Sequence, residues 1–369
     1  MPELDVLVIG AGVTGLATAA QLAADGQSVC VAERHTRPGL DTSTHNSGVI
    51  HAGLYYPRHS LKAKLCVEGA RLLYEFAARY GVPHDRCGKF VVATDDGEVG
   101  DIEKLQQRGR DNGVEGLEIV DDGFIRAREP HVVARAALWS PATGRVDASA
   151  LVRALLRVAQ AAGATFLPAS RVIDGTPRPD GGIDVRLERE TIAARTVVNA
   201  AGLYADEVSA ALGGERFTIY PCRGEYAELK PSRREWVNGL VYPLPHASGH
   251  GLGVHLTKTV GGSVLLGPTA RFQARKDDYE EDRLPLESFV GPTQKLAPMV
   301  SLDDITYGGS GIRAKLHPPS ESFADFLIRA DRQQPALIHA AGMDSPGLTS
   351  CLAVGRLVAS LVNNSPGAR

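Results

Sequence analysis

A glycine-rich turn close to the N-terminus constrains this chain more than any other feature. Gly10-Ala11-Gly12-Val13-Thr14-Gly15 follows a short apolar run, Asp5 to Ile9, and opens an alanine-rich helical segment. A GxGxxG turn between a strand and a helix is typical of a Rossmann-type dinucleotide-binding fold. Gly10 permits the tight turn, Gly12 lets the backbone approach a pyrophosphate, and Gly15 lets the helix pack on the strand. The helix N-terminus then offers N–H groups to the phosphates.

An acidic residue ends the next apolar run. Ser28 to Glu33 is the expected second strand, and Glu33 lies at about the position where such folds carry the carboxylate that binds a ribose. A carboxylate favours a ribose hydroxyl over a 2′-phosphate, so the motif predicts FAD or NAD and disfavours NADP. The geometry of the turn does not choose between FAD and NAD.

Composition excludes several other classes of protein. The chain has 369 residues, enough to bury a core without disulfide or metal staples. A formal net charge of −3 and an aromatic content of 6% disfavour nucleic-acid binding. The five cysteines form no CxxC pair. We therefore predict neither a disulfide framework nor a metal site, and we expect a reducing compartment, the cytoplasm.

The N-terminal apolar run imitates a targeting segment. Leu4 to Ala24 is apolar and alanine-rich, but no Lys or Arg precedes Arg34, and three glycines interrupt the run. A signal peptide needs a positively charged region before its apolar core. We therefore interpret the run as a strand, a turn and a helix, and we expect no integral membrane segment. Peripheral attachment to the inner membrane stays open.

The rest of the chain alternates between two textures. Alanine-rich helices and short apolar strands occupy 1–85, 145–215 and 325–369, whereas strands and turns rich in glycine and proline occupy 86–144 and 216–324. We predict a fold of the α/β plus antiparallel β class. A discontinuous Rossmann-type domain, made of the first three segments, is interleaved with a substrate-binding domain built on a mixed or antiparallel sheet.

A polar, glycine-rich segment follows the second strand, where the ring system of a flavin would lie. This segment, Thr42 to Pro57, together with Leu61 to Cys66, resembles the L-2-hydroxyglutarate dehydrogenases, also called oxidases. These flavoproteins belong to the D-amino-acid oxidase superfamily, and the resemblance covers essentially the whole chain. Asn46 to Gly53 and Gly253 to Thr257 match this family in particular. Segments shared across the superfamily are Val197 to Gly202, Arg223 to Tyr226, Gly311 to Arg313 and Gly342 to Thr349.

The resemblance implies a GR2-like FAD domain with FAD bound non-covalently. It implies oxidation of an L-2-hydroxy acid, above all L-2-hydroxyglutarate, to the 2-oxo acid by hydride transfer to flavin N5. The electron acceptor would be oxygen or a membrane quinone pool. The residues that we expect at the cofactor are Gly10, Gly12, Val13, Thr14, Gly15, Glu33, Arg34, Thr42, Ser43, Thr44, His45, Asn46, Ser47, Gly48, Val172, Ala200, Ala201, Gly202, Gly311, Gly342, Met343, Pro346, Gly347, Leu348 and Thr349.

The implied reaction needs a clamp for the substrate carboxylate and an acceptor for the hydroxyl proton. Arg313 is the expected clamp, because a guanidinium matches a carboxylate with two parallel hydrogen bonds. His51 and His255 are the candidate bases, since an imidazole accepts a proton near neutral pH. We favour His255 as the base and His51 as the residue against the flavin. Cations that could bind a second carboxylate are Lys258, Lys315 and Arg223.

Two alternatives remain at this stage. An amine or amino-acid oxidase of the same superfamily, resembling glycine or sarcosine oxidase, would use the same clamp for a substrate with a neutral amine. A flavin-binding protein without catalysis would need neither the clamp nor the histidines. The segment from Asn46 to Gly53 favours the hydroxy-acid enzyme.

Overall fold

Parallel strands form the centre of the first sheet. The structure is a computed structural model that describes residues 3–179, 181–245 and 253–364. The strand order is β9-β2-β1-β12-β20, with β19 antiparallel at the edge beside β20 and the β10–β11 hairpin against β12. Its strands are β1 (Leu4–Ile9), β2 (Val29–Ala32), β9 (Thr165–Leu167), β10 (Val172–Pro177), β11 (Ile183–Leu187), β12 (Thr191–Asn199), β19 (Leu327–Ala330) and β20 (Leu337–Ala341).

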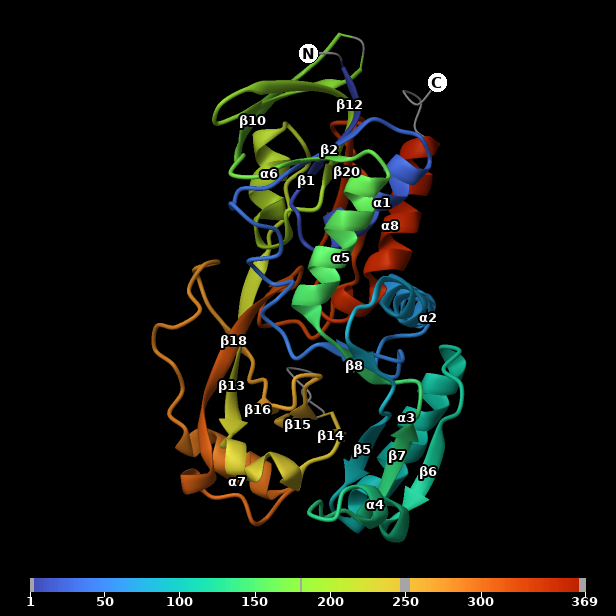
Figure 1. The fold of residues 1–369 in the computed structure, drawn as a ribbon, viewed down its shortest axis with the longest axis vertical. Coiled ribbons are helices and arrows are strands. Elements are labelled where there is room, and N and C mark those ends of the chain that lie inside the picture. The colour runs from blue at the N-terminus through green and yellow to red at the C-terminus, as the bar shows by residue number, and fades with distance from the viewer. Residues whose placement is uncertain (1–2, 180, 246–252, 365–369) are drawn as a thin grey trace.

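Helices cover both faces of this sheet, which is why its central strands are continuously apolar. The helices α1 (Val13–Ala24), α5 (Ala148–Ala161) and α8 (Gly347–Asn363) lie side by side on one face (Figure 1). The short helix α6 (Ala205–Ala211) belongs to the other face. A Cβ on Gly355 would lie 2.8 Å from the backbone of Ala17, so glycine allows α8 to approach α1 closely.

The amphipathic helix α2 (Leu61–Tyr80) packs against α8. The Ser60 side chain accepts a hydrogen bond from the backbone N–H of Ala63 and caps the helix, and Gly81 ends it with a φ of 65°. A small sheet beneath this helix joins β3 (Val49–Ile50), β8 (Gly144–Val146) and β4 (His84–Asp85). The apolar run from Leu4 to Ala24 forms strand β1, the glycine turn and helix α1, as its glycines indicate.

The second sheet is mixed, with the order β17-β13-β16-β15-β14-β5-β7-β6 and with β18 on the other side of β13. Only the β14–β5 pair is parallel among its described strands. Its strands are β5 (Lys89–Ala93), β6 (Glu118–Asp121), β7 (Ala136–Ser140), β13 (Tyr220–Leu229), β14 (Leu240–Pro243), β15 (His255–Lys258), β16 (Val264–Gly267), β17 (Arg271–Phe272) and β18 (Ile305–Lys315).

Short helices cover this sheet, and it has a core of its own. The helices are α3 (Val99–Asp111), α4 (Asp122–Arg128) and α7 (Glu287–Gln294). The 3₁₀ turns among the described residues are Asp96–Glu98, Gly202–Tyr204, Pro231–Trp236 and Leu302–Asp304. The long strands β13 and β18 pair side by side below the parallel sheet (Figure 1). The α/β fold with a second, mixed sheet is confirmed, whereas the domain limits at 85, 145, 215 and 325 stay a prediction. Residues 1–2, 180, 246–252 and 365–369 of those ranges lie outside the described residues.

Among the described residues, none of the helices combines the length and the apolar character that crossing a bilayer requires.

Candidate active site

A cavity of about 840 Å³ runs from the β1–α1 turn to strands β14, β15 and β18. One end lies at the carboxyl ends of β1 and β12, where ligands bind in open parallel sheets. The other end is lined by side chains of the second sheet. A volume of this size falls in the range of cofactor and substrate pockets. The cavity therefore brings together the two halves that the sequence predicts.

The glycine turn has the backbone geometry that its pattern predicts. Gly10 has a φ of 102°, and a Cβ there would lie 2.6 Å from the carbonyl oxygen of Ala200. A Cβ on Gly15 would collide with the carbonyl oxygen of Gly10. Helix α1 has no side-chain cap from its N-cap residue, Gly12, and the N–H of Val13 donates to Ser43 Oγ over 3.0 Å. Gly12, Val13 and Thr14 nevertheless line the cavity, so a phosphate group can reach this helix end.

The carboxylate of Glu33 is buried and fixed beside this turn. It accepts the backbone N–H of Ala11 over 2.8 Å and that of His35 over 2.9 Å. A carboxylate has about four acceptor positions, so these two bonds leave acceptor capacity for the hydroxyls of a ribose. Glu33 lines the cavity. The arrangement fits the adenosine ribose of a dinucleotide.

The segment from residue 39 to residue 57 joins the two halves. Thr42 Oγ1 donates to the carbonyl of Ile312 in β18 over 2.9 Å. Asn46 Nδ2 donates to the carbonyl of Ser43 over 2.8 Å, and its Oδ1 accepts the N–H of Gly48. A Cβ on Gly311 would collide with the carbonyl oxygen of this segment's His45. The segment therefore lies directly against the strand that carries Arg313.

Most of the residues expected at FAD line the cavity, and a few do not. Those that line it are Gly10, Gly12, Val13, Thr14, Glu33, Thr42, Ser43, His45, Asn46, Ser47, Ala200, Ala201, Gly202, Gly311, Met343, Pro346, Gly347 and Leu348. Those that do not are Gly15, Arg34, Thr44, Gly48, Val172, Gly342 and Thr349.

Two of the second group have other partners. Arg34 forms an ion pair with Asp41 over 2.9 Å, and its guanidinium stacks 3.8 Å from the ring centre of Tyr204. Val172 is the first residue of β10, and its side chain packs against the hydrophobic cluster on the α6 face of the first sheet. A direct contact of Arg34 or Val172 with the cofactor stays a prediction.

A second helix N-terminus, that of α8, reaches the cavity from the same carboxyl edge of the parallel sheet, after β20. Helix α8 begins after Pro346, which supplies no side-chain cap, and Pro346, Gly347 and Leu348 all line the cavity. The buried hydroxyl of Thr349 accepts the N–H of His51 over 3.0 Å and so fixes this turn to β3. The positive end of a helix dipole suits the anionic ring of a reduced flavin. The residues present thus fit FAD along the whole cavity.

Arg313 lies at the reaction end of the cavity, on β18. Its Nη1 donates to the carbonyl of Thr269 over 3.2 Å. A Cβ on Gly224 would lie 2.8 Å from that same Nη1, so the missing side chain of Gly224 leaves the space that the guanidinium occupies. One backbone acceptor does not neutralise the charge. Arg313 is therefore suited to a carboxylate ligand.

Both candidate histidines line the same cavity. His255 is buried on β15 and stacks on Tyr242, with ring centres 3.5 Å apart and an angle of 15° between the planes. His51 Nε2 lies 3.4 Å from Ser345 Oγ. Burial, together with the charge of Lys89, lowers the pKa of His51 to about 3. His51 is therefore neutral at physiological pH and can accept a hydrogen bond.

The three cations predicted for a second carboxylate have different positions. Lys315 lines the cavity, but Asp344 already pairs with it over 3.2 Å and with Lys62 over 2.6 Å. Arg223 is fully buried between acids, and its guanidinium pairs with Glu225 and Asp278. Lys258 pairs with Glu235 and does not line the cavity. Of the three, the structure brings only Lys315 to the site.

Several cavity residues were not singled out from the sequence. Three tyrosines line the reaction end: Tyr55, Tyr226 and Tyr242. Lys89 lies outside the cavity lining and donates a hydrogen bond to the hydroxyl of Tyr55. A signal for Lys89 exists, because it opens an otherwise apolar strand, Phe90 to Ala93, that is buried throughout. A lysine in such a strand is exceptional.

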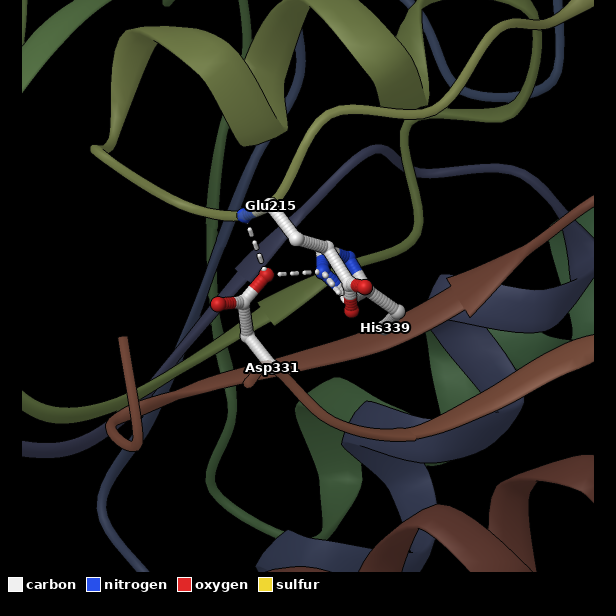
Figure 2. Close-up of side chains that lie close together, drawn as sticks. All are labelled: Glu215, Asp331 and His339. Atoms are coloured by element: carbon white, nitrogen blue, oxygen red, sulfur yellow. Dashed lines mark hydrogen bonds and ion pairs between the residues drawn. The ribbon is translucent and has the colours of Figure 1, made fainter. Parts of the chain in front are cut away.

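A second polar cluster lies away from the cavity. Figure 2 shows His339 Nε2 bonded to Asp331 over 2.7 Å, with Glu215 beside them. Such a trio could ligate a metal. Arg329 already pairs with Glu215 over 2.6 Å, and Asp331 also accepts the backbone N–H of Glu215. The cluster thus joins the β19–β20 hairpin to the segment after α6, and the absence of a metal stays a prediction.

Comparison with known proteins gives a consistent family. The family model described as FAD dependent oxidoreductase (DAO) matches residues 5–361. The mitochondrial L-2-hydroxyglutarate dehydrogenase of Caenorhabditis elegans is 32% identical, over 98% of this chain and 93% of the relative. The human protein of the same name is 32% identical, over 98% of this chain and 89% of the relative. The Arabidopsis thaliana protein is 34% identical, over 97% and 83%.

Solved structures agree with this result. The L-alpha-glycerophosphate oxidase of Mycoplasma pneumoniae, solved with FAD bound, has a TM-score of 0.89 and 27% identity over 100% of this chain and 99% of its own. Glycine oxidase of Geobacillus kaustophilus has a TM-score of 0.83 at 24% identity over 98% of this chain and 95% of its own, a likeness of fold alone. FAD is the cofactor, as the sequence predicts. The chain therefore belongs to the L-2-hydroxyglutarate dehydrogenase family of FAD-dependent oxidoreductases, within the D-amino-acid oxidase superfamily.

Proposed function

We propose that this protein oxidises L-2-hydroxyglutarate at C2 and releases 2-oxoglutarate. One observation carries the proposal: Arg313 and two histidines line the reaction end of a single cavity whose other end is the glycine turn. The names of relatives at 31–34% identity support this substrate. When bound, FAD supplies the acceptor for the hydride that leaves C2.

The side chains of this chain bind and orient the substrate. Arg313 clamps the carboxylate next to C2 through two parallel hydrogen bonds. His255 accepts the hydroxyl proton as the hydride leaves, because a charged imidazole is stabilised by its stacking partner Tyr242. His51 stays neutral and accepts a hydrogen bond, since its pKa is far below the working pH. Buried tyrosines at this end exclude water.

The electron acceptor and the cellular location are also proposals. We keep oxygen and a membrane quinone as acceptors, and peripheral contact with the inner membrane would bring a quinone within reach. All five cysteines are free thiols, which suits a reducing compartment, for which we keep the cytoplasm. Rapid mixing of the reduced enzyme with oxygen, or with a water-soluble quinone, separates the two acceptors by the rate at which the flavin colour returns.

Anaerobic mixing of the holoenzyme with single substrates tests the proposal. We expect L-2-hydroxyglutarate to bleach the flavin, while its D-enantiomer, glycine and sarcosine leave the colour unchanged. Bleaching by glycine or sarcosine, and not by the hydroxy acid, would establish the amine-oxidase alternative. A flavin that no compound bleaches would leave a binding protein without catalysis.

A further inference from the structure

Lys89 is a buried cation that has no carboxylate partner among the residues that the structure describes. Lys89 is the first residue of β5, and 1% of its surface is exposed. Its Nζ donates to the hydroxyl of Tyr55 over 3.1 Å, and it lies 4.6 Å from the ring centre of Tyr55 and 4.7 Å from that of Tyr242. No ion pair joins Lys89 to an acid within 3–179, 181–245 and 253–364. Burying an ammonium group in this way is costly, because water no longer solvates it.

The groups around Lys89 do not supply the missing charge. Burial lowers the pKa of Lys89 to about 7, and the side chain that opposes this shift electrostatically is the thiol of Cys66, whose own pKa is raised by burial. The phenol pKa values of Tyr55 and Tyr242 are raised by burial as well. His51, with a pKa of about 3, is neutral. The side chains beside Lys89 are thus uncharged near neutral pH, and a ligand is the group that could supply an anion to stabilise its charged form.

Tyr55 lines the cavity, whereas Lys89 does not and lies on the far side of Tyr55. The hydroxyl of Tyr55 accepts its hydrogen bond from Lys89, so its own hydrogen remains available to a ligand. The other cations on the cavity wall are less suited to a second carboxylate. Lys315 and Lys62 share Asp344, and Lys104 pairs with Asp101. Arg108 also lines the cavity, but it is exposed, and water solvates its charge at little cost.

We propose that the hydroxyl of Tyr55 binds the second carboxylate of a dicarboxylate substrate. Lys89, which donates to this hydroxyl from outside the cavity, orients it and carries the positive charge. Arg313 holds the carboxylate next to the reacting carbon, and the hydroxyl of Tyr55 donates to the distal one. Lys89 is a positioning residue, since it orients the Tyr55 hydroxyl and supplies the positive charge that the distal carboxylate meets. The assignment rests on the proposed oxidation of a 2-hydroxy dicarboxylate and explains why a dicarboxylate would be preferred over a monocarboxylate.

Two unreactive acids with the same five-carbon chain test this subsite directly. Glutarate has two carboxylates and pentanoate has one, and neither carries a hydroxyl that could be oxidised. The dissociation constant of each acid is measured on the holoenzyme from the change in flavin absorbance. We expect the unchanged protein to bind glutarate at least tenfold more tightly than pentanoate. Equal binding of the two acids would overturn the subsite.

Tyr55→Phe removes only the hydroxyl, and it decides the case even where a lysine variant fails to fold. We expect glutarate binding to weaken about tenfold or more and pentanoate binding to stay unchanged. The matched control is Tyr74→Phe, which deletes another half-buried hydroxyl, one bonded to the carbonyl of Ala142 outside the cavity. A Tyr55→Phe variant that keeps its preference for glutarate overturns the proposal, as does a preference abolished by Arg108→Gln instead.

Lys89→Met removes the charge and shortens the unbranched side chain by one heavy atom. We expect it to weaken glutarate binding, raise KM for L-2-hydroxyglutarate more than it lowers kcat, and leave the FAD content unchanged. In the unchanged protein, glutarate binding should weaken as pH rises above about 7, because Lys89 loses its proton. His255 and Arg313 face the cavity in both proteins, so only the difference between the two pH profiles belongs to Lys89. Identical profiles would contradict its role.

These measurements separate the subsite from the proposed reaction. Glutarate binding that depends on Tyr55, in an enzyme whose flavin L-2-hydroxyglutarate does not bleach, would refute the reaction and keep the subsite. Bleaching by L-2-hydroxyglutarate with a Tyr55→Phe variant that still prefers glutarate would keep the reaction and refute the subsite.

Discussion

The two ends of the cavity are built in different ways. At the nucleotide end, backbone groups and missing side chains form the site, and Gly10, Gly12 and Gly15 belong to one continuous turn. At the reaction end, charged and aromatic side chains from separate strands form it, such as Arg313 on β18 and His255 on β15. We expect added side-chain atoms to abolish cofactor binding at the nucleotide end. At the reaction end, we expect the loss of a charge or a hydrogen-bond donor to weaken substrate binding. Each of the following substitutions tests this contrast.

The largest effect is expected from Gly12→Val at the nucleotide end. A Cβ on Gly12 would lie 2.8 Å from Ser43 Oγ, in the space that the phosphates need. We expect loss of bound FAD and a lower Tm, because a ligand that binds only the native state stabilises it. FAD content is read from absorbance after gel filtration. Gly100→Ala is the control, since a Cβ there meets nothing within 4 Å. A Gly12→Val protein that stays yellow would refute the phosphate assignment.

Arg313→Ala should give the next largest effect, and at the other end only. A hydrogen bond to a charged group contributes about 1.5–3 kcal/mol, so losing the clamp should lower kcat/KM for L-2-hydroxyglutarate by roughly tenfold to a hundredfold. FAD content should not change, because Arg313 is assigned to the substrate. Arg313→Lys should not restore activity, since a lysine lacks the planar fork. The exposed Arg332 provides a control substitution to alanine. Full activity of Arg313→Ala would move the clamp to another cation, with Lys315 first.

Lys89→Met should stabilise the protein while it weakens binding. The pKa of Lys89 is lowered from 10.5 to about 7 in the folded protein, so the unfolded chain binds more protons between those values. The free energy of unfolding should therefore rise with pH over that window and be smallest below pH 7, where the buried charge is complete. The variant should lose this dependence and melt at least about 3 °C higher at pH 7. A lower Tm would mark Lys89 as purely structural.

The smallest effect is expected from metal chelation. Arg329 and backbone N–H groups already satisfy the cluster of Glu215, Asp331 and His339. Incubation with EDTA should leave FAD content, activity and Tm unchanged. A fall in Tm that zinc or another divalent ion reverses would reveal a metal at this cluster.

The nucleotide end could be predicted from the sequence because its determinants are local. Helix α2 follows its amphipathic pattern from Leu61 to Tyr80 and ends at Gly81, and the glycine turn follows β1 as expected. The reaction end depends on pairings between distant segments. The parallel pairing of β14 with β5 puts Tyr242 beside Lys89, and no local pattern predicts it. Arg223 matched a family segment, but burial against Glu225 keeps it away from the cavity.

The order of the segments has a consequence for biosynthesis. Strand β20 and helix α8 are the last elements of the first sheet and its helical layer, and α8 packs on both α1 and α2 near the N-terminus. Because the chain is synthesised from its N-terminus, these elements leave the ribosome only after the described strands of the second sheet. The glycine turn is therefore made early, but the layer that supports it is incomplete until α8 has been synthesised. We expect FAD to be captured only after β20 and α8 have been synthesised, and translation products that end before β20 to be colourless.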